Sequence, residues 1–175
     1  PEDIAAAVAL LNGAKSPLIL AGGGAVRSAA LVKDLAEALD APVVMTTNAR
    51  GILPPDHPLG VYLTPSMPQT RALVAASDVV LALGTEMGPT DYDFYEDGGF
   101  AIPGKLIRVD IDPTQIMRNY MPSLGLVGDV TEALGAGGSR MPSQGELMNR
   151  VTLAKSVVAA TALDEVRVSV GGGVL

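Results

Sequence analysis

Two carboxylates stand directly after an apolar run of the chain, where they could hold a ligand. Asp110 and Asp112 follow residues 106–109, and Pro113 comes next. Asp112 is expected to cap a helix that begins at Pro113, because aspartate is favoured at the N-cap and proline at the first helical position. Asp110 is then the ligand candidate, since open α/β folds bind ligands at the carboxyl edge of the sheet and a carboxylate there can bind a ribose. Helix capping is the alternative role for both.

Three consecutive glycines, Gly22, Gly23 and Gly24, follow another short apolar run. In dinucleotide-binding folds, glycines at this place let the backbone approach a diphosphate at the start of a helix. The fingerprint is incomplete, because its third glycine would fall on Arg27 and the next strand ends without an acid that could bind a ribose. We therefore expect no conventional NAD site. A phosphate-facing loop and a tight turn without a ligand both remain open.

The other chemistry-bearing residues indicate no catalytic centre. His57 is the only histidine, and we interpret it as a loop residue because no serine or cysteine nucleophile has a recognisable setting beside it. The chain has no cysteine, which excludes a thiol nucleophile and a cysteine-based metal site. The acidic loop 91–97 matches no calcium-loop spacing and is interpreted as a solvated or interdomain surface. We also expect Asp129 to be a helix N-cap, and we predict no metal ligands.

The elements that must position these residues alternate between strands and helices. Short, continuous apolar runs predict strands buried on both faces, and helical periodicity fills the intervals between them. Such an order predicts a Rossmann-like, doubly wound parallel sheet of about six strands in a three-layer α/β/α arrangement. Residues 47–68 and 85–104 are expected to be long loops. The expected strands are 17–21, 41–46, 78–83, 106–110 and 124–127, and the expected helices are 3–14, 25–39, 69–76 and one between the last two strands.

The domain organisation follows from the same elements. We expect one domain over residues 1–134, a linker over 135–145, and a C-terminal helix with a tail over 146–175. Ser143 and Glu146 match a capping box for a helix over 144–162, and the sequence does not assign the structure of 163–175. Because the chain begins at Pro1, we expect a piece of a longer polypeptide.

Composition restricts the class of protein. Hydrophobic residues make up 48% and charged residues 18%, which excludes a disordered chain. The net charge of −7 argues against a nucleic-acid partner, which needs a basic face. No apolar run is long enough to span a membrane, and no signal peptide is visible. A cytoplasmic protein without a membrane partner is the expectation.

Six motifs in sequence order resemble the central domain of the thiamine diphosphate enzymes of the acetolactate synthase and 2-oxo-acid decarboxylase family. Together they cover residues 1–134. Within the family, residues 84–93 resemble the branch that includes 5-guanidino-2-oxopentanoate decarboxylase. The six motifs occupy residues 14–24, 41–47, 50–60, 76–84, 108–113 and 128–130.

The resemblance implies a Rossmann-like central domain that holds a non-redox FAD in acetolactate synthase, ADP in some relatives and nothing in others. Carried over, the site would be lined by Gly22, Gly23, Gly24, Gly84, Thr85, Asp110 and Ile111. Two departures argue against FAD. Residues 60–65 replace a Gly-Met-His-Gly loop, and Glu86-Met87-Gly88-Pro89 replaces an Arg-Phe-Asp-Asp-Arg run. Glu86 reverses the local charge and would repel phosphate, so a vacant or adenine-nucleotide site is expected.

The resemblance also implies that catalysis takes place elsewhere. The family holds thiamine diphosphate and Mg²⁺ with Gly-Asp-Gly followed by Asn-Asn, whereas Gly128-Asp129 is followed here by Val130, and Asn149 stands alone. The fragment alone should be inactive. The parent enzyme would be a lyase or transferase that decarboxylates a 2-oxo acid, with or without carboligation. It would be a homodimer or homotetramer, with pyrimidine-binding and diphosphate-binding domains as this domain's partners.

Three alternatives belong to other classes. A stand-alone FAD- or ADP-binding module would share the fold without thiamine chemistry. A sirtuin-type deacylase is disfavoured because the zinc cysteines are missing. A pure interaction module remains open, since a fold does not fix an activity.

Overall fold

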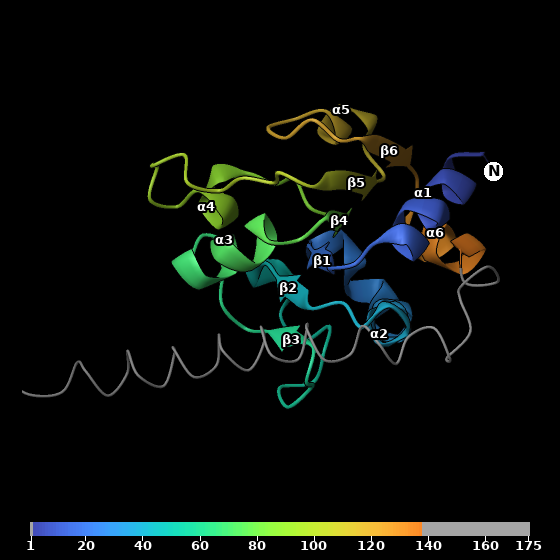
Figure 1. Cartoon of the computed structure of the whole chain (residues 1–175), viewed down its shortest axis with the longest axis horizontal. Coiled ribbons are helices and arrows are strands. Elements are labelled where there is room, and N and C mark those ends of the chain that lie inside the picture. The colour runs from blue at the N-terminus through green and yellow to red at the C-terminus, as the bar shows by residue number, and fades with distance from the viewer. Residues whose placement is uncertain (1, 138–175) are drawn as a thin grey trace, which may run out of the picture.

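The chain forms a three-layer α/β/α domain in the computed structural model, which describes residues 2–137 (Figure 1). Six parallel strands pair in the order β3-β2-β1-β4-β5-β6. This is the order of a doubly wound dinucleotide fold, and it reverses between β1 and β4. The strands are β1 (Pro17–Ala21), β2 (Val43–Met45), β3 (Gly60–Val61), β4 (Val79–Leu83), β5 (Lys105–Asp110) and β6 (Leu124–Val127).

Helices cover both faces of the sheet, with α1, α2 and α6 on one side and α3 and α4 on the other (Figure 1). Successive strand residues point to opposite faces, so Ile19 joins the core beneath α1 and α2, whereas Leu18 and Leu20 join the core beneath α3. Both faces are therefore buried, which explains the continuous apolar runs. The helices are α1 (Glu2–Gly13), α2 (Ala29–Leu39), α3 (Pro68–Ala75), α4 (Pro89–Tyr92), α5 (Pro113–Ile116) and α6 (Val130–Gly137).

The predicted fold class is confirmed, and three local expectations need correction. The helix expected over 25–39 begins instead with a 3₁₀ segment, η1 (Gly23–Ser28), before α2. The loop expected over 47–68 contains the 3₁₀ turn η2 (Thr47–Ala49) and the sixth strand, β3. The loop expected over 85–104 contains α4. The 3₁₀ turn η2, the strand β3 and the helix α4 have two to four residues and lie in segments rich in proline and glycine, so periodicity does not reveal them.

The predicted boundaries at residues 134 and 145 stay predictions. The last described helix, α6, continues to Gly137. The expected helix over 144–162 and the tail over 163–175 lie outside the described residues.

Asp78 lies between α3 and β4 and links two segments that are distant in the sequence. Its carboxylate accepts hydrogen bonds from the backbone amides of Lys15 at 2.7 Å and Ser16 at 3.0 Å, and so joins the start of β4 to the segment that leads into β1. Partial burial raises the pKa of Asp78, but the hydrogen bonds from these amides outweigh it and hold the pKa below the ordinary value of 3.8.

This geometry predicts a pH-dependent effect of the substitution Asp78→Asn. A pKa that is lower in the folded state contributes stability above pH 3.8, and that contribution is lost as the pH falls below this value. Asp78→Asn should therefore lower the free energy of unfolding at pH 7 by about 1 kcal/mol, and urea titrations should show the difference shrinking in acid. The exposed Asp56→Asn is the control. A difference for Asp78→Asn that is constant between pH 7 and pH 3 would contradict this assignment.

Candidate functional site

The turns that follow β1 and β4 pack directly against each other, and glycines make this possible. A Cβ atom at Gly24 would lie 2.9 Å from the Cα atom of Gly84, and one at Gly84 would lie 2.6 Å from the Cα atom of Gly24. A Cβ at Gly22 would overlap the Gly84 carbonyl oxygen and lie 2.5 Å from the Cβ of Thr85. Real Cβ atoms do not come this close to backbone. The glycines are therefore needed for the close packing of the two turns.

Backbone amides of the glycine turn are used within the protein. The amide of Gly22 donates to the carbonyl of Leu83 at 2.9 Å, and the amide of Gly24 donates to that of Gly84 at 3.0 Å. The turn continues into η1, a 3₁₀ helix, and the α-helix begins only at Ala29. A phosphate cradle needs free amides and the dipole of an α-helix N-terminus. The two bonded amides are not free for a phosphate.

A cleft of about 280 Å³ opens beside these turns, at the carboxyl ends of β1, β2 and β4. It lies where the strand order reverses, which is the usual ligand position in this architecture. Gly23, Gly24, Gly84 and Thr85 are the predicted site residues that line it. Glu86, Met87 and Gly88, from the run that replaces the flavin-binding motif, also line it. The sequence gives no indication that Thr46, Asn48, Thr90 and Asp91 belong to the site.

The remaining predicted residues, Gly22, Asp110 and Ile111, do not line the cleft. Gly22 packs against Gly84 and Thr85 in the contact between the two turns. Asp110 is only 8% exposed, and its carboxylate accepts the Asp112 amide at 3.0 Å. Ile111 is 71% exposed at the end of β5. The prediction that Asp112 caps the helix at Pro113 is confirmed, because its carboxylate accepts the Thr114 amide at 2.8 Å.

Arg108 is a buried cation that sequence reasoning missed. Its side chain is 1% exposed and donates to three backbone carbonyls: from Nη1 to Arg118 at 2.6 Å and to Tyr120 at 3.3 Å, and from Nη2 to Thr85 at 3.1 Å. Burial lowers the pKa of the Arg108 guanidinium, and nearby Asp110 opposes this. The only signal in the sequence is a single arginine inside the apolar strand 105–110. Arg108 fixes the start of the loop that forms one wall of the cleft.

Two further residues, Tyr92 and Asn119, hold the same wall of the cleft in place. The Thr85 hydroxyl lies 2.9 Å from the Tyr92 hydroxyl, and burial raises the pKa of Tyr92 well above its ordinary value. Asn119 donates from Nδ2 to the Met87 carbonyl at 3.1 Å and to the Glu86 carbonyl at 3.5 Å. Met87, at φ +53°, is 1% exposed. The backbone on both sides of Glu86 is therefore held by contacts with β5 and the segment after α5.

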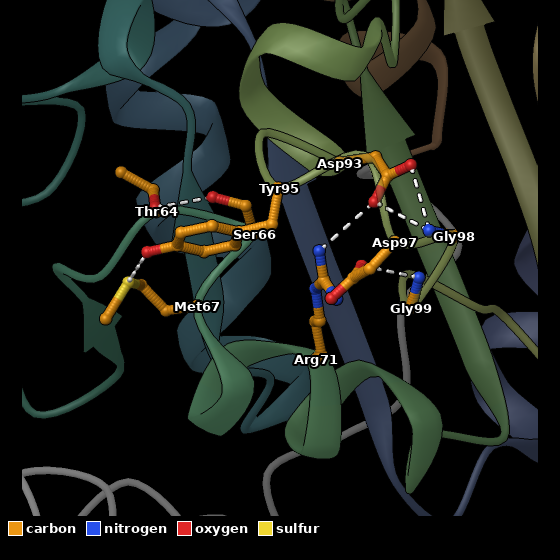
Figure 2. A network of polar contacts seen from close by, with 9 residues as sticks. All are labelled: Thr64, Ser66, Met67, Arg71, Asp93, Tyr95, Asp97, Gly98 and Gly99. Carbon is orange, nitrogen blue, oxygen red and sulfur yellow. Dashed lines mark hydrogen bonds and ion pairs between the residues drawn. The ribbon is translucent and has the colours of Figure 1, made fainter.

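The loop beyond this wall is attached to α3 through Arg71 (Figure 2). Arg71 binds the carboxylates of Asp97 at 2.6 Å and Asp93 at 3.2 Å, and these accept the amides of Gly99 and Gly98, respectively. The hydrogen bond from Arg71 is the largest cause holding the pKa of Asp97 below its ordinary value. The acidic loop is thus an ordered surface feature, in which Arg71 neutralises two of the carboxylates.

The remaining candidates have structural partners. Nδ1 of His57 accepts the Leu59 amide at 3.2 Å, and its Nε2 lies 3.2 Å from the Glu37 carboxylate, which fits a loop residue held by its turn. Asp129 accepts the Thr131 amide at 2.7 Å at the start of α6, as expected of an N-cap. Among residues 2–137, no three histidine or acidic side chains gather so that they could hold a metal ion.

The sheet order, the glycine turns and the cleft are those of a nucleotide-binding architecture, and comparison with known proteins decides the family. Residues 4–136 match the model of the thiamine pyrophosphate enzyme central domain. The chain belongs to this family. Its members use thiamine pyrophosphate, and the resemblance stated from the six motifs is confirmed.

Similar proteins include a probable decarboxylase and acetolactate synthases. A probable 2-ketoarginine decarboxylase (AruI) from Pseudomonas aeruginosa is 36% identical over 143 residues, which cover 82% of this chain and 25% of that protein. Acetolactate synthase from Mycobacterium leprae is 39% identical, over 74% of this chain and 21% of that protein. The large subunit of acetolactate synthase isozyme 1 from Escherichia coli is 32% identical, over 76% of this chain and 24% of that protein. 2-Ketoarginine is another name for 5-guanidino-2-oxopentanoate. The similarity to this decarboxylase therefore matches the branch of the family that residues 84–93 resemble.

The chain spans about a quarter of the length of these relatives. It corresponds to their central domain. No helix among residues 2–137 is both long enough and apolar enough to cross a bilayer.

Proposed function

We propose that this central domain serves as the scaffold of a thiamine diphosphate-dependent enzyme that decarboxylates a 2-oxo acid, with a guanidino 2-oxo acid as the leading substrate class. The observation that carries the proposal is the match to the central-domain model over residues 4–136, together with the similarity to a 2-ketoarginine decarboxylase over 82% of the chain. Acetolactate synthase-like carboligation is the second candidate, because relatives of that name are equally similar.

The cofactor chemistry is assigned to other domains of the parent enzyme. Thiamine diphosphate would supply the electron sink for the carbanion that decarboxylation leaves. Mg²⁺ would bind with it, between pyrimidine-binding and diphosphate-binding domains, in a cytoplasmic homodimer or homotetramer. Gly128-Asp129-Val130 lies within the match to the central-domain model and is not the family's diphosphate motif, and the Asp129 carboxylate caps α6. The absence of that motif from the sequence supports a thiamine diphosphate site outside this domain.

A nucleotide-binding role for the seven predicted residues stays a prediction. FAD fits poorly, because the amides of Gly22 and Gly24 are already bonded and the lining that residues 2–137 provide contains Glu86 and Asp91 but no lysine or arginine. A thermal-shift titration of the chain with ADP, FAD and NAD tests this role directly. Ligand at 100 times its dissociation constant would stabilise the domain by about 2.7 kcal/mol.

The test of the scaffold role is a decarboxylation assay. We expect the 175-residue chain, given thiamine diphosphate, Mg²⁺ and either pyruvate or 2-ketoarginine, to release no CO₂ above a protein-free control. A longer polypeptide that contains this sequence with its flanking domains should release CO₂ faster from 2-ketoarginine than from pyruvate. Turnover by the bare chain would overturn the proposal, and acetolactate as the main product would replace the first candidate with the second.

A further inference from the structure

We propose that Glu86 is a specificity-determining residue that excludes phosphate-bearing ligands from the cleft between the β1 and β4 turns. The proposal deepens the prediction that this cleft is the ligand site of the central domain. It does not depend on which reaction the parent enzyme catalyses, because it concerns only the described cleft.

The first observation is the balance of charge on the lining. The cleft contains two carboxylates, Glu86 and Asp91, and its other polar side chains are the neutral Thr46, Asn48, Thr85 and Thr90. Among residues 2–137, no lysine or arginine lines it. A nucleotide diphosphate would bring at least two negative charges into a space that already holds two. Such like charges repel each other, and solvent reduces the repulsion because Glu86 is exposed.

The second observation is that the backbone around Glu86 is held in place, so it cannot move the carboxylate away from a bound phosphate. Thr85 on one side is held through its carbonyl by the buried Arg108, at 3.1 Å. Met87 on the other side is buried, donates its amide to the Thr85 hydroxyl at 3.3 Å and has its carbonyl bound by Asn119. Glu86 itself is exposed. Its side chain therefore projects from a fixed backbone at the cleft.

The third observation is that the backbone amides of the glycine turn are not available to offset the charge of a phosphate. In a phosphate-binding turn, free amides offset the charge of the ligand. Here the amides of Gly22 and Gly24 donate to Leu83 and Gly84 instead. To free them, the turns after β1 and β4 would have to separate, and the glycine contact shows how closely they are packed. Repulsion by Glu86 is thus left without an opposing attraction from these donors.

The experiment compares ADP with adenosine, which has the same base and ribose but no phosphate. Binding to the native chain, to Glu86→Gln and to Glu86→Arg would be followed by two-dimensional NMR of the amides of Gly23, Gly24 and Gly88. Glu96→Gln is the matched control, because it removes the same charge from an exposed position that does not line the cleft. Urea titrations check that each variant keeps its stability.

We expect Glu86→Gln to tighten ADP binding about tenfold and Glu86→Arg to tighten it by a further tenfold or more. The gain should shrink in high salt, as expected of a partly exposed charge interaction. Adenosine binding should be the same in all four proteins, and Glu96→Gln should behave like the native chain. Equal ADP affinity in the native protein and both Glu86 variants, including no detectable binding in any of them, would overturn the proposal. These results do not depend on the decarboxylation assay, so either proposal can fail alone.

Discussion

Replacing Arg108 by alanine is expected to lower the free energy of unfolding by about 3 to 5 kcal/mol. The guanidinium is 1% exposed and satisfies the carbonyls of Thr85, Arg118 and Tyr120. Alanine would leave these acceptors without their donor and open a cavity beside Tyr92. A domain of this size is typically stable by about 5 to 15 kcal/mol, so the loss would be a large fraction of the total. Urea or guanidinium titration followed by far-UV circular dichroism measures it.

Two further variants separate the contributions of Arg108. Arg118→Ala changes an exposed arginine whose backbone carbonyl, not its side chain, receives Arg108, and it should change stability by no more than about 0.5 kcal/mol. Arg108→Met keeps most of the volume and removes the donors, so it should fall between alanine and the native chain. If Arg108→Ala were as stable as Arg118→Ala, the three carbonyl contacts would not be holding the cleft wall.

Gly84→Ala is expected to destabilise the domain by about 3 kcal/mol or more. The backbone of Gly84 has φ +54°, a left-handed conformation that costs an alanine roughly 1 kcal/mol. The new methyl group would also lie 2.6 Å from the Cα of Gly24, and neither backbone can turn away. The two turns would have to separate and give up the hydrogen bond from the Gly24 amide to the Gly84 carbonyl. Chemical denaturation measures the loss.

Gly88→Ala is the matched control in the same loop. Gly88 has φ −76°, and a Cβ there would meet no atom of residues 2–137 within 4 Å. Its substitution should therefore change the free energy of unfolding by no more than about 0.5 kcal/mol. Equal losses for Gly84→Ala and Gly88→Ala would show that the contact between the β1 and β4 turns does not stabilise the fold.

Arg108 and Gly84 both hold the same wall of the cleft in place, although they lie in different segments of the sequence. Gly84 brings the wall against the glycine turn, and Arg108 holds the next residue, Thr85, from β5. The position of Glu86 follows from both. Loss of either contact should therefore loosen the cleft as well as destabilise the domain.

The architecture and the family could be predicted from the sequence because their signals are local. Five of the six strands appear as short apolar runs, and burial on both faces explains the runs of β1, β2, β4 and β5. The edge strand β6 is only partly buried. Asp112 was recognisable as a cap because its partner, the Thr114 amide, is two residues away. The sixth strand, β3, has two residues and gives no such pattern.

The parallel α/β fold, membership of the thiamine enzyme family and the positions of the glycine turns can be inferred from the amino-acid sequence. The contacts of those glycines, the burial of Arg108 and the lining of the cleft become known only from the folded chain. Strand runs and caps depend on neighbours along the chain, whereas the cleft depends on pairing β1 with β4 and β4 with β5. That pairing brings Gly24, Gly84 and Arg108 together from three separate segments, and no periodicity of the sequence records it.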